Sequence, residues 1–482
     1  MRPTVAATFC ALVVSILVVS IFGVGATSTS AQEVPKPNFV FILADDMRAD
    51  DLRYMPKTNA LLAEQGMRFE NAFVSYALCC PSRSTIMRGQ YAHNTGVWDH
   101  VSGPDGGWEG YQNHGNEQDN VATRLHEAGY RTGLFGKYLN GYYDTTYVPP
   151  GWDDWFVKFS RYEWSGKFNY QYYDYDVNDN GAITHFGTDT ADYSTDVIGG
   201  RAQEFIGASV AEGKPFFAYV APSAPHGPAI PAQRHLRAFE GEQAPRLPSF
   251  NEEDVSDKPP GIQSRQSLGA KITTKIDTRH EKRVGTLQAL DELVEGVVSQ
   301  LEGLGALENT YVVFTSDNGW YHGEHRVAKG KSLPYEEGIH MPLLIRGPGV
   351  QAGSTTDALT LNTDFLPTFT DLAGIQTPEY VDGRSLRPLL EESATITWRT
   401  AILLERRNLN TPGTSFYGVR TSDGKKYVEY EDGFRELYDL ETDPHELVNS
   451  YDATAPPADL APRLEVLKRC AGETCRAAED GP

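Results

Sequence analysis

The sequence predicts an α/β protein with a large, mostly parallel mixed sheet sandwiched by helices, followed by a smaller C-terminal antiparallel sheet with a helix. Three observations support this prediction. Nearly unbroken apolar runs are typical of strands buried on both faces. Segments with helical spacing lie between them. After about residue 390 the runs become short and alternating, as in an antiparallel sheet. Strands that alternate with helices favour a layered α/β domain.

The large domain is expected at residues 32–390. Its buried strands are predicted at 38–43, 215–220 and 311–315. A short helix is predicted over 120–128, where Gly129 ends it. A second helix is predicted from six apolar residues that recur at helical spacing, namely Val284, Leu287, Leu290, Val294, Val297 and Leu301.

Two stretches of this domain lack such periodicity. Residues 160–195 are rich in Tyr, Asp and Asn and predict an exposed hairpin or loop insertion. Residues 240–280 carry many charges and Pro259-Pro260, and predict a long surface excursion. The smaller domain, 391–482, is expected to hold strands near 401–404, 415–420 and 426–429 and a closing helix near 457–469.

The N-terminus has the features of a secretory signal. An apolar stretch from Leu12 to Val24 follows Arg2, and small residues end at Ala31, so residues 1–31 are predicted to be removed. An uncleaved membrane anchor is the alternative. Cys10 does not make a lipoprotein signal, because bulky Phe9 precedes it. No later segment is apolar enough to span a bilayer. We therefore expect an exported protein without stable membrane insertion.

Charge and cysteine content narrow the function further. The formal net charge of −22 argues against nucleic-acid binding, which requires a basic surface, and disfavours long polyanionic glycans unless a local basic patch overrides it. Cys470 and Cys475 could close a small disulfide loop. Cys80 would remain as a small hydrophobic residue. A disulfide between Cys79 and Cys80 is the less favoured alternative.

Two motifs carry a family resemblance. The first is Cys79-Cys80-Pro81-Ser82-Arg83, within a longer match from Ala77 to Gly89, and the second runs from Gly129 to Leu139. Taken alone, the first motif could simply start a helix, with Ser82 near its N-cap and Arg83 solvated. Together, in this order, the motifs resemble the type I (formylglycine-dependent) sulfatases of the alkaline-phosphatase-like superfamily.

This resemblance implies an unusual nucleophile. In that family a formylglycine-generating enzyme oxidises the motif's cysteine, here Cys79, to formylglycine. The hydrated aldehyde has two hydroxyls on one carbon: one attacks the sulfur of a sulfate ester, and loss of the proton from the other expels sulfate. An ordinary serine would lack this second step.

A metal site is predicted at the ends of two strands. Asp45 and Asp46 follow the first buried strand, and Asp317 and Asn318 follow another. Oxygen atoms that converge at one sheet edge suit a hard cation. Alternatively, Asp45 and Asp317 could cap turns. The resemblance implies that all four residues bind a divalent metal, with calcium favoured and magnesium possible.

Positive and proton-transferring groups are also expected around the sulfate. Arg83 lies four residues beyond Cys79, on the same face if a helix begins there. Lys137 and Lys331 resemble the two sulfate-binding lysines of the family. His226, in Ala224-Pro225-His226-Gly227-Pro228, resembles the histidine that protonates the leaving oxygen; a structural histidine is the alternative.

Weaker candidates and the substrate complete the prediction. His322, His325 and His93 are expected to contact substrate. Tyr91-Ala92-His93-Asn94 and Gly136-Lys137-Tyr138-Leu139-Asn140 resemble N-acetylglucosamine-6-sulfatases, so a sulfated sugar is the expected substrate. An arylsulfatase, a phosphonate or phosphodiester hydrolase with the same site, and a non-catalytic binder of sulfated glycans remain alternatives.

Overall fold

The computed structural model of the chain describes residues 35–142, 146–159, 172–391, 397–408 and 414–481, with isolated residues before position 12. Lys36–Pro482 form one compact unit, separate from Met1–Pro35. The predicted signal segment, 1–31, lies almost wholly outside the described residues. Among the residues that are described, no helix is both long and apolar enough to cross a bilayer.

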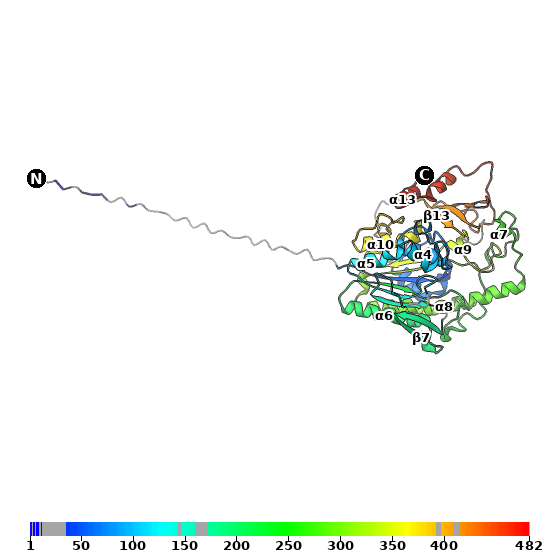
Figure 1. Ribbon diagram of the computed structural model, residues 1–482, viewed down its shortest axis with the longest axis horizontal. Helices are drawn as coiled ribbons and strands as arrows, with labels where there is room; N and C mark the ends of the chain where they lie inside the picture. Colours follow the sequence, from blue (N-terminus) through cyan, green and yellow to red (C-terminus); the bar gives the residue numbers. More distant parts are fainter. Residues whose placement is uncertain are drawn as a thin grey trace. The chain divides into compact units, whose positions relative to one another are not determined.

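A ten-stranded mixed sheet forms the centre of this unit (Figure 1). Its strand order is β11-β2-β10-β9-β1-β8-β4-β5-β6-β7, and the five central strands β9, β1, β8, β4 and β5 are parallel. The strands span β1 (Asn38–Ala44), β2 (Met67–Phe69), β4 (Arg131–Gly136), β5 (Asp154–Phe159), β6 (Tyr175–Asp179), β7 (Ala182–Phe186), β8 (Phe216–Ala221), β9 (Thr310–Ser316), β10 (Leu343–Arg346) and β11 (Ser354–Thr356).

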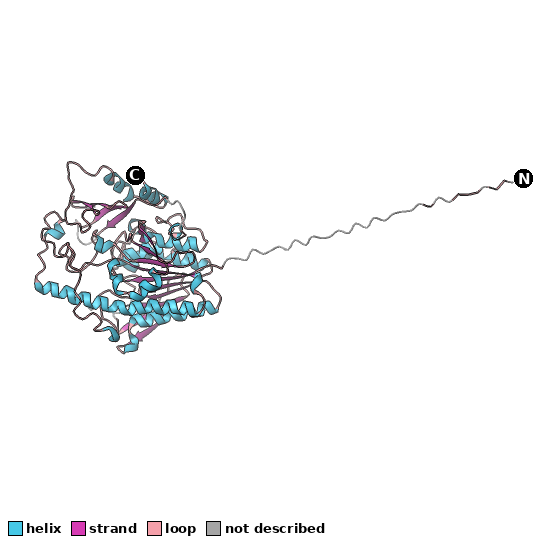
Figure 2. Cartoon of the chain, turned by 180° about the vertical axis from the view of Figure 1, so that it is seen from behind, coloured by secondary structure: helices cyan, strands magenta, loops and turns pink. Residues whose placement is uncertain are grey.

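Helices cover both faces of the sheet, as the apolar runs predicted (Figure 2). Along β1, Phe39 and Phe41 pack into one core with residues of α2, α5 and α10, while Val40 and Ile42 pack into another with α6 and α8. The helices are α1 (Pro56–Thr58), α2 (Cys79–Arg88), α3 (Ala92–Thr95), α4 (Gly107–Asn113), α5 (Val121–Glu127), α6 (Ser194–Ala211), α7 (Pro260–Gln263), α8 (Ala270–Gly303), α9 (Glu336–Ile339), α10 (Phe365–Leu372) and α11 (Arg387–Leu390).

The C-terminal part contains the expected antiparallel sheet. Its four strands are consecutive, β13 (Ala401–Arg406), β14 (Phe416–Thr421), β15 (Lys425–Tyr430) and β16 (Arg435–Asp439). The predicted closing helix is α12 (Leu460–Leu467), and a further helix, α13 (Glu473–Asp480), follows it. This sheet is separate from the ten-stranded one, although both lie in the same compact unit; the boundary near residue 390 stays a prediction.

The two irregular stretches turn out differently. Strands β6 and β7 form a hairpin that extends the edge of the large sheet, and β7 is mostly exposed, whereas residues 160–171 lie outside the described part. The prediction of a surface excursion over 240–280 is wrong at its end, because helix α8 already begins at Ala270. This first part of α8 buries few side chains, so its sequence shows little apolar periodicity.

The remaining elements are short. Two further strands, β3 (Ala72–Phe73) and β12 (Thr360–Leu361), pair in parallel. Six 3₁₀ turns and one π turn connect the larger elements: η1 (Ala49–Tyr54), η2 (Asn59–Ala63, the π turn), η3 (Asn116–Gln118), η4 (Thr190–Asp192), η5 (Gln233–His235), η6 (Leu307–Asn309) and η7 (Asn362–Asp364).

Candidate active site

Four oxygen-bearing side chains meet at the carboxyl ends of β1 and β9. These strands are parallel neighbours, and Ala44 lies opposite Ser316, so the residues that follow them are level with each other. The Asp46 amide donates to Asp317 Oδ1 at 3.0 Å, and Asn318 Nδ2 donates to Asp46 Oδ1 at 2.7 Å. Asp46 adopts a φ of 70°, a left-handed conformation that aspartate tolerates better than most residues. The predicted convergence is therefore present.

Three oxygen atoms of this group have no hydrogen-bond partner within the described part of the chain. They are Asp45 Oδ1, Asp46 Oδ2 and Asn318 Oδ1, and all three side chains are fully buried. Buried polar atoms in native proteins are almost always satisfied, so an unpartnered set such as this one is unusual. Carboxylate and amide oxygens are the ligands of hard divalent cations. The donor set therefore fits the predicted metal.

Cys79 begins helix α2 and lies beside these carboxylates. The ligand atoms of Asp45, Asp46, Cys79 and His226 all lie within 4.8 Å of one another. Burial raises the pKa of the Cys79 thiol, despite the opposing influence of two nearby lysines. A protonated, buried thiol is a poor nucleophile. The environment therefore does not favour an ordinary cysteine nucleophile.

Arg83 is a buried member of the site, not a solvated helix residue. It lies one helical turn beyond Cys79, has no exposed surface, and donates from Nε to Asp317 Oδ2 at 2.8 Å. Its Nη1 donates to the Lys137 carbonyl at 3.0 Å. The alternative in which Arg83 is solvated is wrong, because the guanidinium ties α2 to the ends of β4 and β9.

Two lysines neutralise the aspartates. Lys137 directly follows β4, and its Nζ lies 2.6 Å from Asp45 Oδ2. Lys331 contacts the Asp46 carboxylate, and its Nζ lies 2.7 Å from Cys79 Sγ. Burial by itself favours the neutral carboxyl and ammonium forms, but these contacts lower the pKa of both aspartates and raise the pKa of both lysines. The charged forms therefore persist at neutral pH.

His226 faces the same group of residues from the loop after β8. Its Nδ1 lies 2.6 Å from the Gly227 carbonyl, which can only accept, so Nδ1 carries a proton. Nε2 lies 3.6 Å from Asp46 Oδ2. Burial lowers the pKa of His226, although both aspartates oppose this shift. The imidazole is thus oriented with Nε2 toward the site.

One lysine at the site was missed from the sequence. Lys158 on β5 donates from Nζ to Ser223 Oγ at 2.7 Å. Burial lowers the pKa of Lys158 to about 7; Asp45 opposes this shift and Lys137 adds to it, so both charged groups lie within electrostatic range. A single lysine inside the apolar run Trp155-Phe156-Val157-Lys158-Phe159 was the available signal.

A second missed residue is Arg283 on α8, which contacts the loop that follows β1 and the loop that follows β8. Its Nη2 donates to the Asp46 carbonyl at 2.5 Å, and Nη1 donates to the Pro225 carbonyl at 3.1 Å. It therefore holds the backbone of Asp46 and of the loop that carries His226. Its position just before the apolar stripe of α8 gave no sign of this contact.

The three weaker histidine candidates make other contacts. His93 is held between Glu405 Oε2 and the Cys470 carbonyl, each at 2.9 Å. His325 Nδ1 lies 2.7 Å from Glu252 Oε2, and its ring stacks on Tyr335. His322 is fully buried against the ring of His280. Within the described residues, none has a hydrogen bond or ion pair to the Cys79 site, so the predicted substrate contacts find no support.

The cysteine predictions are settled. Cys470 and Cys475 form a disulfide with their Cα atoms 4.7 Å apart, as expected. Cys79 and Cys80 are both free, which excludes the alternative disulfide between them in this structure. Cys80 is completely buried in the core, in agreement with its predicted packing role.

An open pocket of about 260 Å³ borders the nucleophile position. Leu78 and Ser332 line it, and they are the chain neighbours of Cys79 and Lys331. The other lining residues are Tyr76, Asp99, His100, Val101, Arg406 and Asn408. Burial lowers the pKa of His100, and the positive charges of Lys331, Lys137 and His226 lower it further, whereas Asp99 raises it. The pocket therefore lies next to the buried Cys79 site.

Comparison with known families identifies the class of protein. The sulfatase family model matches residues 37–375, and the model of the N-sulphoglucosamine sulphohydrolase C-terminal region matches residues 323–466. The chain therefore belongs to the sulfatase family, whose members hydrolyse sulfate esters.

Individual relatives agree with this assignment. The chain is 32% identical to human N-acetylglucosamine-6-sulfatase over 498 residues, covering 95% of this chain and 88% of that protein. It is 37% identical to the Drosophila melanogaster extracellular sulfatase SULF-1 homolog over 393 residues, covering 78% of this chain. The chain spans only about a third of that relative and about half of its Caenorhabditis elegans counterpart.

Solved structures share the fold. BT4656 in complex with its substrate D-glucosamine-2-N,6-O-disulfate has a TM-score of 0.72 and 27% identity, covering 87% of this chain and 94% of that one. Agrobacterium radiobacter phosphonate monoester hydrolase has a TM-score of 0.66 and 21% identity, covering 87% and 92%. The second similarity shows a common fold only.

Proposed function

We propose that this protein hydrolyses sulfate esters of a sugar at the site built around Cys79. One observation carries the proposal: Lys331 contacts both the Cys79 sulfur and the Asp46 carboxylate, within a buried group that also holds three unpartnered oxygen atoms. The candidate nucleophile, the lysine ammonium groups and the candidate metal ligands thus lie close together. Transfer of a charged sulfuryl group requires such an arrangement.

Two groups must be supplied to the chain. Asp45, Asp46, Asp317 and Asn318 would hold a divalent cation, for which calcium is our first choice; it would draw charge from a sulfate oxygen and stabilise an ionised hydroxyl beside it. Cys79 would be oxidised to formylglycine by a formylglycine-generating enzyme, which would provide the geminal hydroxyls described above. The raised pKa of the thiol supports this, since the unmodified cysteine would be a weak nucleophile.

The side chains around Cys79 divide the remaining work. Lys137 and Lys331 remain charged and would bind the sulfate oxygens. Arg83, fixed by Asp317 and the Lys137 carbonyl, would orient residue 79 and keep the carboxylates in place. His226 donates from Nδ1 to the Gly227 carbonyl and faces the site with Nε2. Its imidazolium form, which the charges of Asp45 and Asp46 favour, would give the Nε2 proton to the leaving oxygen, because a sugar alkoxide leaves poorly without one.

The substrate we propose is a sulfated amino sugar such as N-acetylglucosamine 6-sulfate. The support comes from the relatives: the human protein is an N-acetylglucosamine-6-sulfatase, and BT4656 was solved with a sulfated glucosamine. We also propose that the protein acts outside the cytoplasm, given the predicted signal over 1–31 and the extracellular relatives.

The test is turnover by protein matured in a host that generates formylglycine. Residue 79 is first identified by mass spectrometry of the peptide that contains it. N-acetylglucosamine 6-sulfate, an aryl sulfate and an aryl phosphonate are then compared by kcat/KM. We expect the sulfated sugar to be the preferred substrate. A phosphonate preference of several orders of magnitude would replace the proposal by a phosphonate hydrolase, and an unmodified thiol in the native protein would favour a binding role.

A further inference from the structure

A second pocket continues the one beside Cys79. It has a volume of about 230 Å³ and shares Arg406 and Asn408 with the first. The two pockets are also lined by consecutive residues, Ser332 in the first and Leu333 in the second. A molecule that reaches Cys79 through the first pocket therefore has an adjoining compartment for whatever is attached to it.

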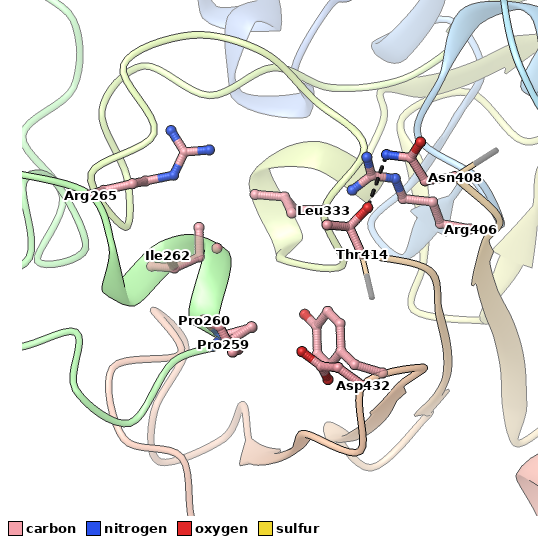
Figure 3. Close-up of a pocket in the computed structure, with 11 residues that line it drawn as sticks. Pro259, Pro260, Ile262, Arg265, Leu333, Arg406, Asn408, Thr414 and Asp432 are labelled. Atoms are coloured by element: carbon pink, nitrogen blue, oxygen red, sulfur yellow. Dashed lines mark hydrogen bonds between the residues drawn. The ribbon is translucent and has the colours of Figure 1, made fainter. Parts of the chain in front are cut away.

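The lining of the second pocket combines apolar surface with charge (Figure 3). Its apolar part comes from Pro259 and Ile262 near α7, from Leu333, and from Tyr430 on β15. Arg265 and Arg406 lie on opposite sides of Leu333 (Figure 3). Apolar and aromatic surface suits the C–H faces of a sugar ring, whereas guanidinium groups recognise planar or tetrahedral anions with paired hydrogen bonds.

Within the residues that the structure describes, neither guanidinium forms an ion pair with a carboxylate; burial lowers the pKa of Arg265, and no carboxylate opposes this shift. Arg406, at the end of β13, lies beside the Tyr76 hydroxyl and lines both pockets. One acid, Asp432, also lines the pocket, but it is exposed and accepts from the Phe434 amide at 2.9 Å.

We propose that the second pocket binds the sugar residue linked to the one that carries the reacting sulfate, and that Arg265 and Arg406 bind a carboxylate or sulfate group on that neighbouring residue. The preferred substrate is then an acidic oligosaccharide and not a monosaccharide. Asp432 is positioned to accept a hydroxyl of the same sugar. This inference rests on the proposed function, because it takes the first pocket as the place of the sulfated residue.

Binding tests it independently of turnover. The parent is the Cys79→Ala variant with calcium present, so no substrate is consumed. Titration calorimetry compares N-acetylglucosamine 6-sulfate, a disaccharide that links it to a uronic acid, and the same disaccharide with the carboxylate reduced to an alcohol. We expect the acidic disaccharide to bind about tenfold more tightly than the reduced one, as for one charged hydrogen-bonded contact. Arg265→Gln, which changes only the second pocket, should remove most of this difference and leave the monosaccharide affinity unchanged. Arg406→Gln should also reduce the difference between the two disaccharides.

The control is Arg237→Gln, an exposed arginine that lines neither pocket, which should retain the tenfold preference. Melting temperatures confirm that each variant is folded. Equal affinity for the two disaccharides in the parent, or an equal loss for all three ligands in Arg265→Gln, would overturn the inference. Turnover of N-acetylglucosamine 6-sulfate by the matured wild-type protein is measured separately, so its failure would count against the proposed function and not against this pocket.

Discussion

Two buried groups of charged side chains in this molecule differ in how fully their hydrogen-bonding capacity is used. In the Lys426 cluster (Glu336, Arg420, Lys426 and Glu446), Lys426 Nζ has three acceptors, the Pro334 carbonyl at 3.0 Å, Glu336 at 2.7 Å and Glu446 at 2.8 Å. An ammonium has three N–H donors, so its capacity is used fully. Arg420 supports Glu336 from the other side at 3.1 Å.

The group at the ends of β1 and β9 is also buried but incomplete. Its lysines and Arg83 are paired, whereas one oxygen each of Asp45, Asp46 and Asn318 has no hydrogen-bond partner among the described residues. A complete buried network stabilises one structure, and an incomplete one costs free energy unless a ligand satisfies it. We therefore assign a structural role to the Lys426 cluster and a binding role to the Cys79 site. Three predictions test this distinction, and a fourth concerns a separate buried ion pair.

The largest effect should come from Cys79→Ser. A single hydroxyl could accept sulfate but could not expel it, so multiple turnover should fall by ~10⁴-fold, the range seen when a catalytic nucleophile is removed. Steady-state rates measure this loss, and calcium-dependent stabilisation of the variant checks that the metal site is intact. Substantial multiple turnover by the serine variant would contradict the mechanism.

Lys426→Met should act on stability. It leaves Glu446 buried without its lysine, which typically costs about 3 kcal/mol or more when one partner of a buried pair is removed. The free energy of unfolding in urea gives the value. Turnover per folded molecule should change far less than in Cys79→Ser. A large loss of turnover with unchanged stability would mean that this cluster is not purely structural.

Metal binding should stabilise the folded protein through the Cys79 site and not through the Lys426 cluster. Calcium at about 100 times its Kd should add about 2.7 kcal/mol to the free energy of unfolding, and a chelator should remove this increment. In Asp45→Asn the increment should shrink greatly, whereas Lys426→Met should retain it. An equal calcium effect in wild type and Asp45→Asn would exclude this group of oxygens as the metal site. Magnesium in place of calcium tests the choice of ion.

The smallest effect should come from His93, whose side chain contacts Glu405 on strand β13. Burial alone would lower the pKa of His93, but Glu405 raises it to about 9. The pKa of His93 in the folded protein exceeds the usual value of about 6.5. Protonated His93 therefore contributes its full share to the free energy of unfolding below about pH 6.5, and this contribution is lost as the pH rises through about 9. The loss should be on the order of 2 kcal/mol in unfolding experiments across this range. His93→Asn should lack this pH dependence; an unchanged profile would assign it to another group.

Much of this arrangement could be predicted from local patterns. The runs at 38–43 and 311–315 are apolar on both faces, so they had to be central strands, and residues 45–46 and 317–318 had to emerge at the same edge. The spacing of Cys79 and Arg83 placed both on one face of α2. The spacing of Cys470 and Cys475 allowed a disulfide, and the structure contains it.

Other features depended on contacts that no local pattern contains. Lys158, Arg283 and Arg265 reach their sites from β5, α8 and the segment after α7, which are far from Cys79 in the chain. The positions of His322 and His325 after Asp317-Asn318 suggested substrate contact, which stays a prediction; their observed neighbours, His280 and Glu252, come from other segments of the chain.

The amino-acid sequence by itself indicated the central buried strands, the helical placement of Cys79 and Arg83, and Cys79 as the candidate nucleophile, because each depends on periodicity or on a short motif. Only the tertiary structure decided which polar atoms are satisfied and which remain open, since partners come from segments more than two hundred residues apart, such as Arg83 with Asp317 and Lys331 with Cys79. Hydrogen-bond capacity is a property of each side chain, but its use depends on the folded neighbourhood.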